Sequence, residues 1–259
     1  MTDAIYEQRD GFVHATGFAR GPWDPNAQHG GAPAAIIMRA LEQLKEADHS
    51  LQLARVTYEL IRPVPLGDLH VSAAVVRPGR KVQLLEASLA TPDGTEVVKA
   101  RALLIARAPV STEPIDLPAP GGIDDLTEDT TFSAGRQMYV NGGIEVRLAQ
   151  GHFHEQGPAF AWFRLKMPLV AGENPSPLQR LVAAADFPNG ISSELSWDEY
   201  VFINPDLTVY VEREPRGDWI VLDAQTRGVE NGGGLAQAVL YDAEGRVGRS
   251  LQSLYVARR

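Results

Sequence analysis

The sequence contains a weak internal repeat, which limits the chain to folds that can be built from two similar halves. The pentapeptide PLGDL at residues 65–69 returns as PRGDW at residues 215–219, about 150 residues later. A second match at nearly the same spacing joins Asp93 and Glu244, each followed by glycine and by a run that ends in Ala-Arg. We interpret the repeat as a duplicated unit. Where the two copies differ in polar residues, we expect one of them to carry the function.

The composition is that of an ordinary globular protein, with 44% hydrophobic and 22% charged residues in a chain of 259 residues. That length is sufficient for two modest domains, each with its own core. The net charge of −9 argues against a nucleic-acid partner. The chain has no cysteine, so it has no disulfide, thiolate nucleophile or zinc–thiolate site. No apolar run approaches the ~20 residues that span a bilayer, and residues 1–10 lack a basic and apolar leader. We therefore predict a cytoplasmic protein without membrane insertion.

In the first half, one helical segment is surrounded by strand-like segments. Residues 30–45 carry Ile37, Leu41 and Leu44 at helical spacing, and Pro33 is tolerated in the first turn of a helix. Alternating or continuous apolar runs, separated by turn sequences, predict strands at residues 11–18, 51–61, 69–76, 81–91 and 96–106.

The second half is predicted to repeat this order after a linker. Residues 108–135 are rich in Pro and acidic residues and are interpreted as the linker between domains 1–107 and 136–259. Ser176 and Pro177 form a favourable helix start, and an apolar stripe runs from Leu178 to Ala185. Further strands are predicted at residues 145–148, 159–167, 207–214, 219–228, 235–242 and 247–257.

Each half therefore has one long helix and a sheet that is too large for that helix to flank. The economical arrangement is an α+β fold in which an antiparallel sheet wraps around each helix.

Asp186 is the most informative single residue. It lies four residues after Val182 and eight after Leu178, so a helix that buries those two side chains turns Asp186 toward the same apolar surface. A buried carboxylate is costly unless it is compensated, and such groups are common at catalytic sites. The pattern equally allows an exposed carboxylate in the last helical turn before Pro188. When the two helix starts are aligned, the first copy has Arg39 at this position and offers no acid.

Two polar residues interrupt apolar faces of the predicted strands. Thr226 continues the apolar face of strand 219–228, and Gln252 shares its face with Leu254 and Val256. Both could meet Asp186 above one helix. Each also suits a hydrogen-bonded core position, because Thr is common in strands and Gln can lie at a sheet edge.

His29, Gly30 and Gly31 open the first predicted helix. Two glycines at a helix start let a ligand approach the backbone, and free N–H groups there favour a carbonyl oxygen that gains negative charge. A plain turn before a helix explains the same residues. In the second copy, Ser176 and Pro177 replace the glycines and cannot offer the same donors. Donors from one copy and an acid from the other are what a composite site between the halves requires.

Several short motifs, in specific order and spacing, resemble the TesB-like double-hotdog acyl-CoA thioesterases over nearly the whole chain. They are His29-Gly30-Gly31, Ile61-Arg62-Pro63, Ala184-Ala185-Asp186-Phe187, LDAQTR at 222–227, GLA at 234–236, LYD at 240–242 and SLQ at 250–252. The resemblance implies a tandem hotdog fold in which two long helices are each wrapped by an antiparallel sheet. In that family an Asp, a Thr or Ser and a Gln position a water that attacks the thioester carbonyl. The Asp and Gln fall on Asp186 and Gln252. A gapless alignment would put Arg227 at the Thr position, whereas the facing pattern favours Thr226.

The resemblance implies hydrolysis of a fatty acyl-CoA to the free acid and CoA, without a cofactor or a metal. Asp186 would act as general base or would orient the water, Thr226 and Gln252 would hold the water, and the Gly31 N–H would receive the oxyanion. Each such group is typically worth ~2 to 4 kcal/mol of barrier.

His29 and Gly30 would lie beside the substrate. Arg62 and Arg80, together with Lys81, are candidate contacts for the CoA phosphates, but solvated charges at strand ends are the simpler explanation. Besides the acyl-CoA substrate, the resemblance implies assembly into a homo-oligomer, a dimer or tetramer.

A hotdog-fold enoyl-CoA hydratase is the alternative enzyme. The run from Asp24 to His29 resembles the Asp-x-Asn-Pro-x-His core of the (R)-specific enoyl-CoA hydratases, but Ala27 replaces the Pro and the Ser/Thr-Gly before the Asp is absent. A non-catalytic acyl-CoA-binding protein is a third possibility. No Gly-x-Ser-x-Gly motif is present, and His152 and His154 have no evident third metal ligand.

Overall fold

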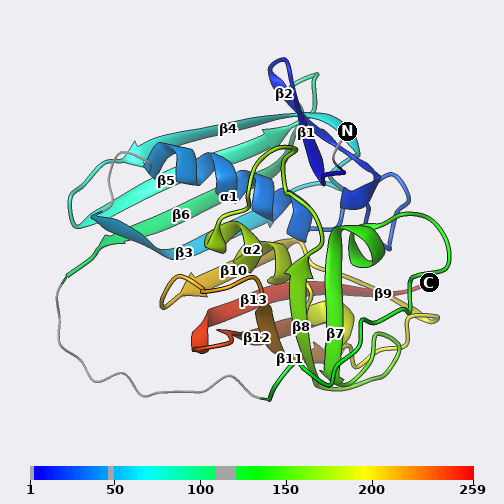
Figure 1. Ribbon diagram of the computed structural model, residues 1–259. Coiled ribbons are helices and arrows are strands. Elements are labelled where there is room, and N and C mark those ends of the chain that lie inside the picture. Colours follow the sequence, from blue (N-terminus) through cyan, green and yellow to red (C-terminus); the bar gives the residue numbers. More distant parts are fainter. Residues whose placement is uncertain (1–2, 46–49, 109–120) are drawn as a thin grey trace.

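The computed structural model describes residues 3–45, 50–108 and 121–259, and their strands form one large antiparallel sheet of 13 strands (Figure 1). The first half contributes β1 (Tyr6–Arg9), β2 (Phe12–Ala15), β3 (Leu51–Leu60), β4 (Gly67–Arg77), β5 (Val82–Ala90) and β6 (Glu96–Ala106). The second half contributes β7 (Ile144–Gln150), β8 (Ala159–Leu165), β9 (Tyr200–Ile203), β10 (Asp206–Val211), β11 (Ile220–Val229), β12 (Gly233–Asp242) and β13 (Gly245–Arg258).

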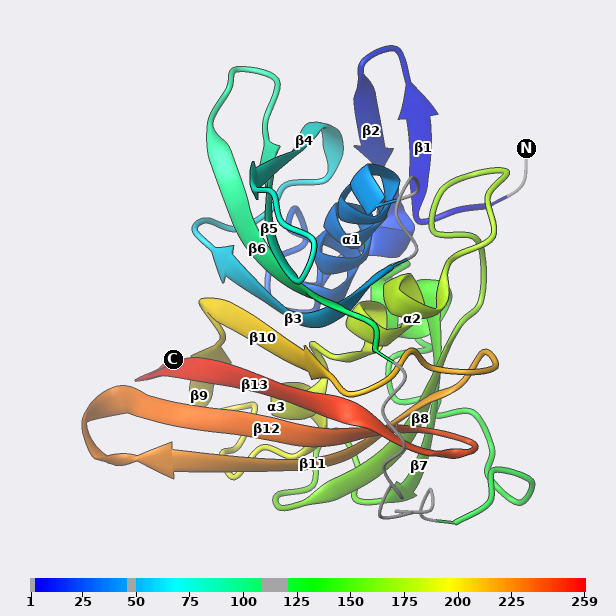
Figure 2. The same ribbon diagram turned by 90° about the vertical axis from the view of Figure 1, so that its left-hand side faces the viewer.

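Within the described residues, three α-helices pack inside the curve of this sheet. They are α1 (Gly31–Lys45), α2 (Pro177–Ala184) and the single turn α3 (Pro188–Ile191). Shorter 3-10 and π-helical turns are η1 (Gly17–Ala19), η2 (Tyr139–Gly143) and η3 (Glu230–Gly232). Strands β4, β5 and β6 curve around α1, while α2 packs against β8 and β11 (Figures 1 and 2). The α+β double-hotdog arrangement predicted from the sequence is confirmed.

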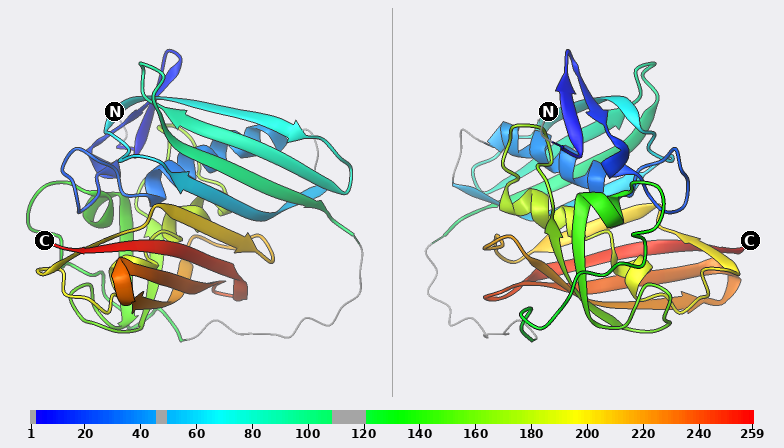
Figure 3. Two further views of the ribbon diagram at one scale, coloured as in Figure 1. Left: turned by 180° about the vertical axis from the view of Figure 1, so that it is seen from behind. Right: turned by 45° about the vertical axis from the view of Figure 1, so that its right-hand side comes forward.

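The order of strands makes the duplication visible. Across the sheet it runs β1-β2-β4-β5-β6-β3 and then β10-β13-β12-β11-β8-β7, so the second half reads as the first half reversed. The halves join where β3 and β10 pair antiparallel, side by side in the middle of the sheet (Figure 3). Among the strands of the described residues, β9 has no counterpart in the first half, and it pairs with β13.

The repeated sequences occupy equivalent turns. Gly67 and Gly217 lead into β4 and β11 with φ of 95° and 72°, a left-handed conformation that glycine adopts without strain. Gly94 and Gly245, which belong to the second sequence match, also have positive φ, at the β5–β6 and β12–β13 connections. The sequence repeat therefore corresponds to a repeated structural unit.

The two helices differ in length. The buried face of α1 includes Ile37 and Leu41, whereas the side chain of Leu44, at the end of the helix, is exposed. Helix α2 has only eight residues and ends at Ala184. Pro188 lacks an N–H that could extend α2, and it occupies the first turn of α3 instead.

Part of the predicted linker packs onto the second half. Within it, residues 109–120 lie outside the described residues. After them, the Asp129 N–H donates to the Val146 carbonyl of β7 at 2.7 Å, and the Phe132 ring packs edge-on against Phe153 with centroids 5.0 Å apart. The domain boundaries at residues 107 and 136 stay a prediction.

Candidate active site

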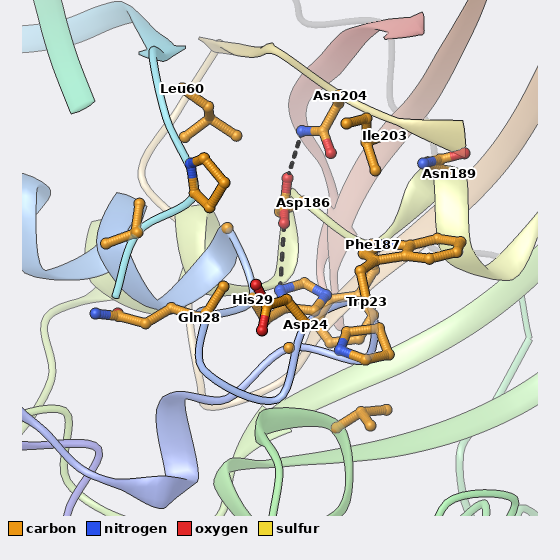
Figure 4. A pocket seen from close by; sticks show the side chains of 18 of the residues that line it. Trp23, Asp24, Gln28, His29, Leu60, Asp186, Phe187, Asn189, Ile203 and Asn204 are labelled. Carbon is orange, nitrogen blue, oxygen red and sulfur yellow. Dashed lines mark hydrogen bonds and ion pairs between the residues drawn. The ribbon is translucent and has the colours of Figure 1, made fainter. Parts of the chain in front are cut away.

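A cavity of about 320 Å³ lies between the two halves, at the start of α1 (Figure 4). The first half contributes His29 and Arg62 to its wall, and the second half contributes Asp186 and Asn204. Polar groups from both copies of the repeat thus face one space, as the sequence analysis expected of a composite site.

Asp186 lies in the short connection between α2 and α3, and its side chain is only 5% exposed. The apolar stripe of α2 points into the core, with Leu178, Leu181 and Val182 all buried. Because Asp186 follows this stripe by one turn, it is carried toward the start of α1. Of the two orientations that the sequence allowed for Asp186, the structure has the buried one.

Four hydrogen-bond donors surround the Asp186 carboxylate. Asn204 Nδ2 and Gln252 Nε2 each donate to Asp186 Oδ1 at 2.8 Å, and the backbone N–H groups of Gly30 and Gly31 also hydrogen-bond to the carboxylate. Burial nevertheless dominates and raises the pKa of Asp186 to about 7, while these four hydrogen bonds act in the opposite direction. The carboxylate is thus held in a site where it can both release and accept a proton near neutral pH.

His29 is the aromatic neighbour of Asp186. Its Nδ1 lies 3.2 Å from Asp186 Oδ2 and accepts a hydrogen bond from the Gly31 N–H at 3.1 Å. The imidazole stacks against Phe187, with ring centroids 4.3 Å apart. Burial lowers the pKa of His29 to about 3, so the ring is neutral at neutral pH. Because Nδ1 accepts from the Gly31 N–H it carries no proton, so the neutral imidazole can accept a hydrogen bond from a protonated Asp186.

Gln252 is fixed by contacts with the backbone around Asp186. Besides its bond to Oδ1, its side-chain amide donates to the Asp186 carbonyl at 3.2 Å and accepts from the Asn189 N–H at 3.3 Å. Gln252 is fully buried on β13, as the facing pattern predicted. Its amide therefore keeps one orientation toward the carboxylate.

Thr226 points inward but meets a different partner. It is buried on β11, whereas its neighbour Arg227 is exposed, so the facing argument gave the correct side of the strand. Its hydroxyl pairs with Ser192 Oγ at 2.9 Å. In the sheet, Thr226 pairs with Ala236, which pairs with Gln252, so Thr226 and Gln252 are two strands apart, about 10 Å. The structure therefore joins Asp186 with Gln252 but gives Thr226 a separate contact.

Asn204 is the residue that the sequence analysis missed. It lies in the turn between β9 and β10, where it donates both to Asp186 and to the Asp206 carbonyl at 3.1 Å. Neither β9 nor α3 was predicted, because residues 188–205 show no sustained helical or strand period. The only signal was Asn before Pro205, which indicates a turn but not its partner.

The glycines at the start of α1 leave room for the carboxylate. A methyl group on Gly30 would lie 2.6 Å from Asp186 Oδ2, and one on Gly31 would lie 2.4 Å from the Ala183 carbonyl oxygen. The N–H groups that were expected to meet an oxyanion are directed at Asp186 and at His29 instead. The role of the Gly31 N–H in stabilising an oxyanion stays a prediction.

The two candidate phosphate contacts lie far apart. Arg62 lines the cavity, and its guanidinium donates to the Glu96 carbonyl at 2.7 Å. Arg80 follows β4, which starts near the cavity and runs away from it over 11 residues, or about 35 Å. The structure therefore brings only Arg62 to the cavity.

The residues behind the other hypotheses have other partners. Asp24 lines the cavity but accepts from the Asn26 N–H at 2.8 Å, and the carboxylate beside His29 is that of Asp186. His152 contacts Thr131 and Asp129. Among residues 3–45, 50–108 and 121–259, no group of three or more His, Cys, Asp or Glu side chains could hold a metal ion. In the same residues, no helix has the length and apolarity needed to cross a bilayer.

Two family models match the chain in succession. Residues 19–105 match the acyl-CoA thioesterase N-terminal domain, and residues 114–256 match the acyl-CoA thioesterase C-terminal domain. The chain belongs to the acyl-CoA thioesterase family. It is thus a thioester hydrolase of that family, and the resemblance drawn from its sequence is confirmed.

Solved structures agree with the family in fold. A candidate thioesterase from Novosphingobium aromaticivorans has 24% identity and a TM-score of 0.72, with 97% of this chain and 98% of that chain covered. A hot-dog-fold protein of unknown function from Alicyclobacillus acidocaldarius has 17% identity and a TM-score of 0.72, covering 98% and 95%. Acyl-CoA thioesterase II TesB2 from Mycobacterium marinum has 14% identity and a TM-score of 0.69, covering 98% and 95%. The search of curated proteins gave no match.

Proposed function

We propose that this member of the acyl-CoA thioesterase family hydrolyses an acyl-CoA to the free acid and CoA with Asp186 as the general base. The observation that carries the proposal is the buried carboxylate, whose pKa is raised to about 7 at the wall of a cavity between the halves. A general base is most effective when its pKa lies near the working pH, because it is then largely ionised and still accepts a proton readily.

The reaction proceeds by direct attack of water. Asp186 takes a proton from the water as its oxygen bonds to the thioester carbonyl carbon, and the carbonyl oxygen becomes an oxyanion. The tetrahedral intermediate then collapses, the carbon–sulfur bond breaks, and the thiolate of CoA takes the proton back from Asp186. Atoms and charge balance without a covalent enzyme intermediate or a cofactor.

Gln252 and Asn204 act as positioning residues. Both donate to Asp186 Oδ1 at 2.8 Å, which leaves Oδ2 on the side of His29. Asn204 thereby has the place beside the carboxylate that the sequence analysis gave to Thr226. Neutral His29 accepts from Asp186 once the carboxyl is protonated, and so stabilises the proton there until the thiolate leaves.

The start of α1 stabilises the negative charge at each step of the reaction. Its N–H groups donate to the Asp186 carboxylate before the reaction. As charge moves from Asp186 to the thioester oxygen, the same donors and the helix dipole favour the new position of the charge. The Gly31 N–H can serve the oxyanion only by turning from its present acceptors.

A thiol-release assay on short, medium and long acyl-CoAs tests the proposal. We expect release of free CoA by the wild-type protein, with kcat/KM falling about tenfold per pH unit below the Asp186 pKa of about 7. Hydration of an enoyl-CoA without thiol release would instead identify the protein as a hydratase. Tight binding of acyl-CoA without turnover over the whole panel would identify a binding protein.

A further inference from the structure

The cavity has two unlike ends on either side of Asp186. In Figure 4, Leu60 lies on one side of the carboxylate, and Phe187 and Trp23 lie on the other. The first end carries Arg62 and Pro63, which follow Leu60 closely in the chain and are exposed. This end therefore opens to solvent.

The second end, here named the closed end, has more deeply buried side chains in its wall. Phe153, Phe187 and Val140 line the cavity and are 3%, 2% and 8% exposed. The CoA part of a substrate is large and charged and must extend into water, whereas the acyl group gains from leaving water. With the thioester at Asp186, the acyl group therefore occupies the closed end.

The wall of the closed end is a connected cluster of aromatic rings. Trp23 and Trp197 stack with centroids 4.5 Å apart and planes inclined by 5°. Phe132 lies 6.4 Å from Trp197 and 5.0 Å from Phe153, the latter contact being edge-on at 78°. All four line the cavity. Such a wall offers ring faces and ring edges, which an aromatic guest uses in stacked and edge-on contacts that an alkyl chain cannot make.

The aromatic wall begins beside the carboxylate. Phe187 follows Asp186 directly in the chain and lines the same cavity. A ring bound against this wall therefore lies within a few carbons of a thioester held at Asp186.

We propose that the acyl group of the substrate carries an aromatic ring within a few carbons of the thioester carbonyl, as in an arylalkanoyl-CoA. This inference rests on the proposed hydrolysis at Asp186 and narrows its substrate class. It names a different acyl group from the fatty acyl chain that the family resemblance implied.

Matched thioesters with equal carbon number test the inference. We expect kcat/KM for 3-phenylpropanoyl-CoA to exceed that for nonanoyl-CoA by roughly tenfold, the size of one or two favourable aromatic pairs. Nonanoyl-CoA hydrolysed as well as or better than its aromatic counterpart, or a preference for hexadecanoyl-CoA, would overturn the inference. If the folded protein releases thiol from none of these substrates, the proposed hydrolysis itself is contradicted.

A pair of tryptophan variants connects the preference to the wall. Trp197→Leu keeps an apolar side chain but removes a ring, so we expect the aromatic-to-alkyl ratio of kcat/KM to fall several-fold while nonanoyl-CoA turnover persists. Trp219→Leu is the matched control, because Trp219 packs near Arg164, at 4.6 Å, and is not part of the cavity wall. If Trp197→Leu fails to fold, Phe132→Leu gives the same readout. An unchanged ratio in a folded wall variant would contradict the inference.

Discussion

The starts of α1 and α2 occupy corresponding places in the two halves, yet only one of them borders the cavity. At the start of α1, the glycines leave the backbone open and the Asp186 carboxylate from the other half approaches it. At the start of α2, Ser176 Oγ accepts from the Gln179 N–H at 3.1 Å and donates to Glu42 Oε2 of α1 at 2.7 Å. Each helix start thus meets a carboxylate from the opposite half.

The two helix starts differ in the groups that lie between the helix and the carboxylate from the opposite half. The Gln179 side chain also donates to Glu42 at 2.8 Å, so the α2 start is closed by side-chain hydrogen bonds. Pro177 removes one backbone donor as well. At the α1 start, no side chain projects from Gly30 or Gly31, and burial raises the pKa of Asp186. The comparison indicates that a duplicated fold makes one reactive site by leaving one helix start open and capping the other.

The largest expected difference between the two starts is catalytic. Asp186→Asn keeps the shape of the side chain but cannot take a proton, so we expect kcat to fall by roughly 10² to 10⁴-fold with the fold retained. Glu42→Gln is the matched control at the other helix start, and its kcat stays within about twofold of wild type. Thiol release by both variants, with circular dichroism to verify folding, measures this. Near-wild-type turnover by Asp186→Asn would remove the basis of the comparison.

The second prediction concerns the space that glycine leaves. In Gly31→Ala the new methyl group meets the Ala183 carbonyl oxygen at 2.4 Å, so α1 and α2 must move apart. We expect a loss of about 1 to 3 kcal/mol in the free energy of unfolding and a clear fall in kcat/KM. Ser176→Ala loses a helix cap, at a cost of about 1 kcal/mol, with kcat/KM unchanged. Urea unfolding and the thiol-release assay separate the two. Equal effects of both variants on kcat/KM would show that the helix starts do not differ in function.

The third prediction distinguishes Asn204 from Thr226. Asn204 lowers the pKa of Asp186 by hydrogen bonding to its ionised form, so Asn204→Ala should move the acidic limb of the kcat/KM profile to higher pH. At neutral pH we expect a loss of roughly tenfold. Thr226→Val breaks the contact with Ser192 and should leave the limb where it is. A shifted limb in Thr226→Val but not in Asn204→Ala would reverse the assignment of the positioning residue.

The smallest expected effect is on stability as a function of pH. The folded-state pKa of Asp186 is raised from 3.8 to about 7, so its contribution to stability is fully present below pH 4 and is lost as the pH rises through 7. The folded-state pKa of His29 is lowered from 6.5 to about 3. The contribution of His29 to stability is therefore lost as the pH falls through that range. The two opposing trends partly cancel in the wild type.

Asp186→Asn removes only the first of these trends. The Tm of Asp186→Asn relative to wild type should therefore increase between pH 5 and pH 8, where the wild type bears the growing cost of a buried anion. Thermal unfolding of both proteins across this range measures the difference. A constant or decreasing difference would indicate that Asp186 is already ionised at pH 5.

The sequence predicted what depends on periodicity. The helical period of α2 carried Asp186 to the buried side, and the alternation of β11 and β13 put Thr226 and Gln252 on the inner face. The sequence repeat located equivalent turns in the two halves. These features follow from local geometry alone, which is why one sequence was sufficient for them.

The contacts along each face could not be predicted in this way. Alternation says which side Thr226 faces but not that Ser192 lies opposite it. Asn204 contacts Asp186 from an irregular turn, and such a turn has no hydrophobic periodicity from which the contact could be predicted. The position of Arg80 depends on the length and direction of β4. The sequence predicted this strand but did not indicate which of its ends borders the cavity.

Titration of the Asp186 carboxyl by carbon-13 NMR tests the central claim most directly. The spectrum of Asp186→Asn identifies the resonance, and the assignment does not require knowledge of the substrate. We expect a midpoint near pH 7, because burial outweighs the four hydrogen bonds to the carboxylate. A midpoint near or below pH 4 would show that the donors at the α1 start fully compensate for burial, and that Asp186 is a structural carboxylate at a helix start, as Glu42 is, rather than the base of a thioesterase.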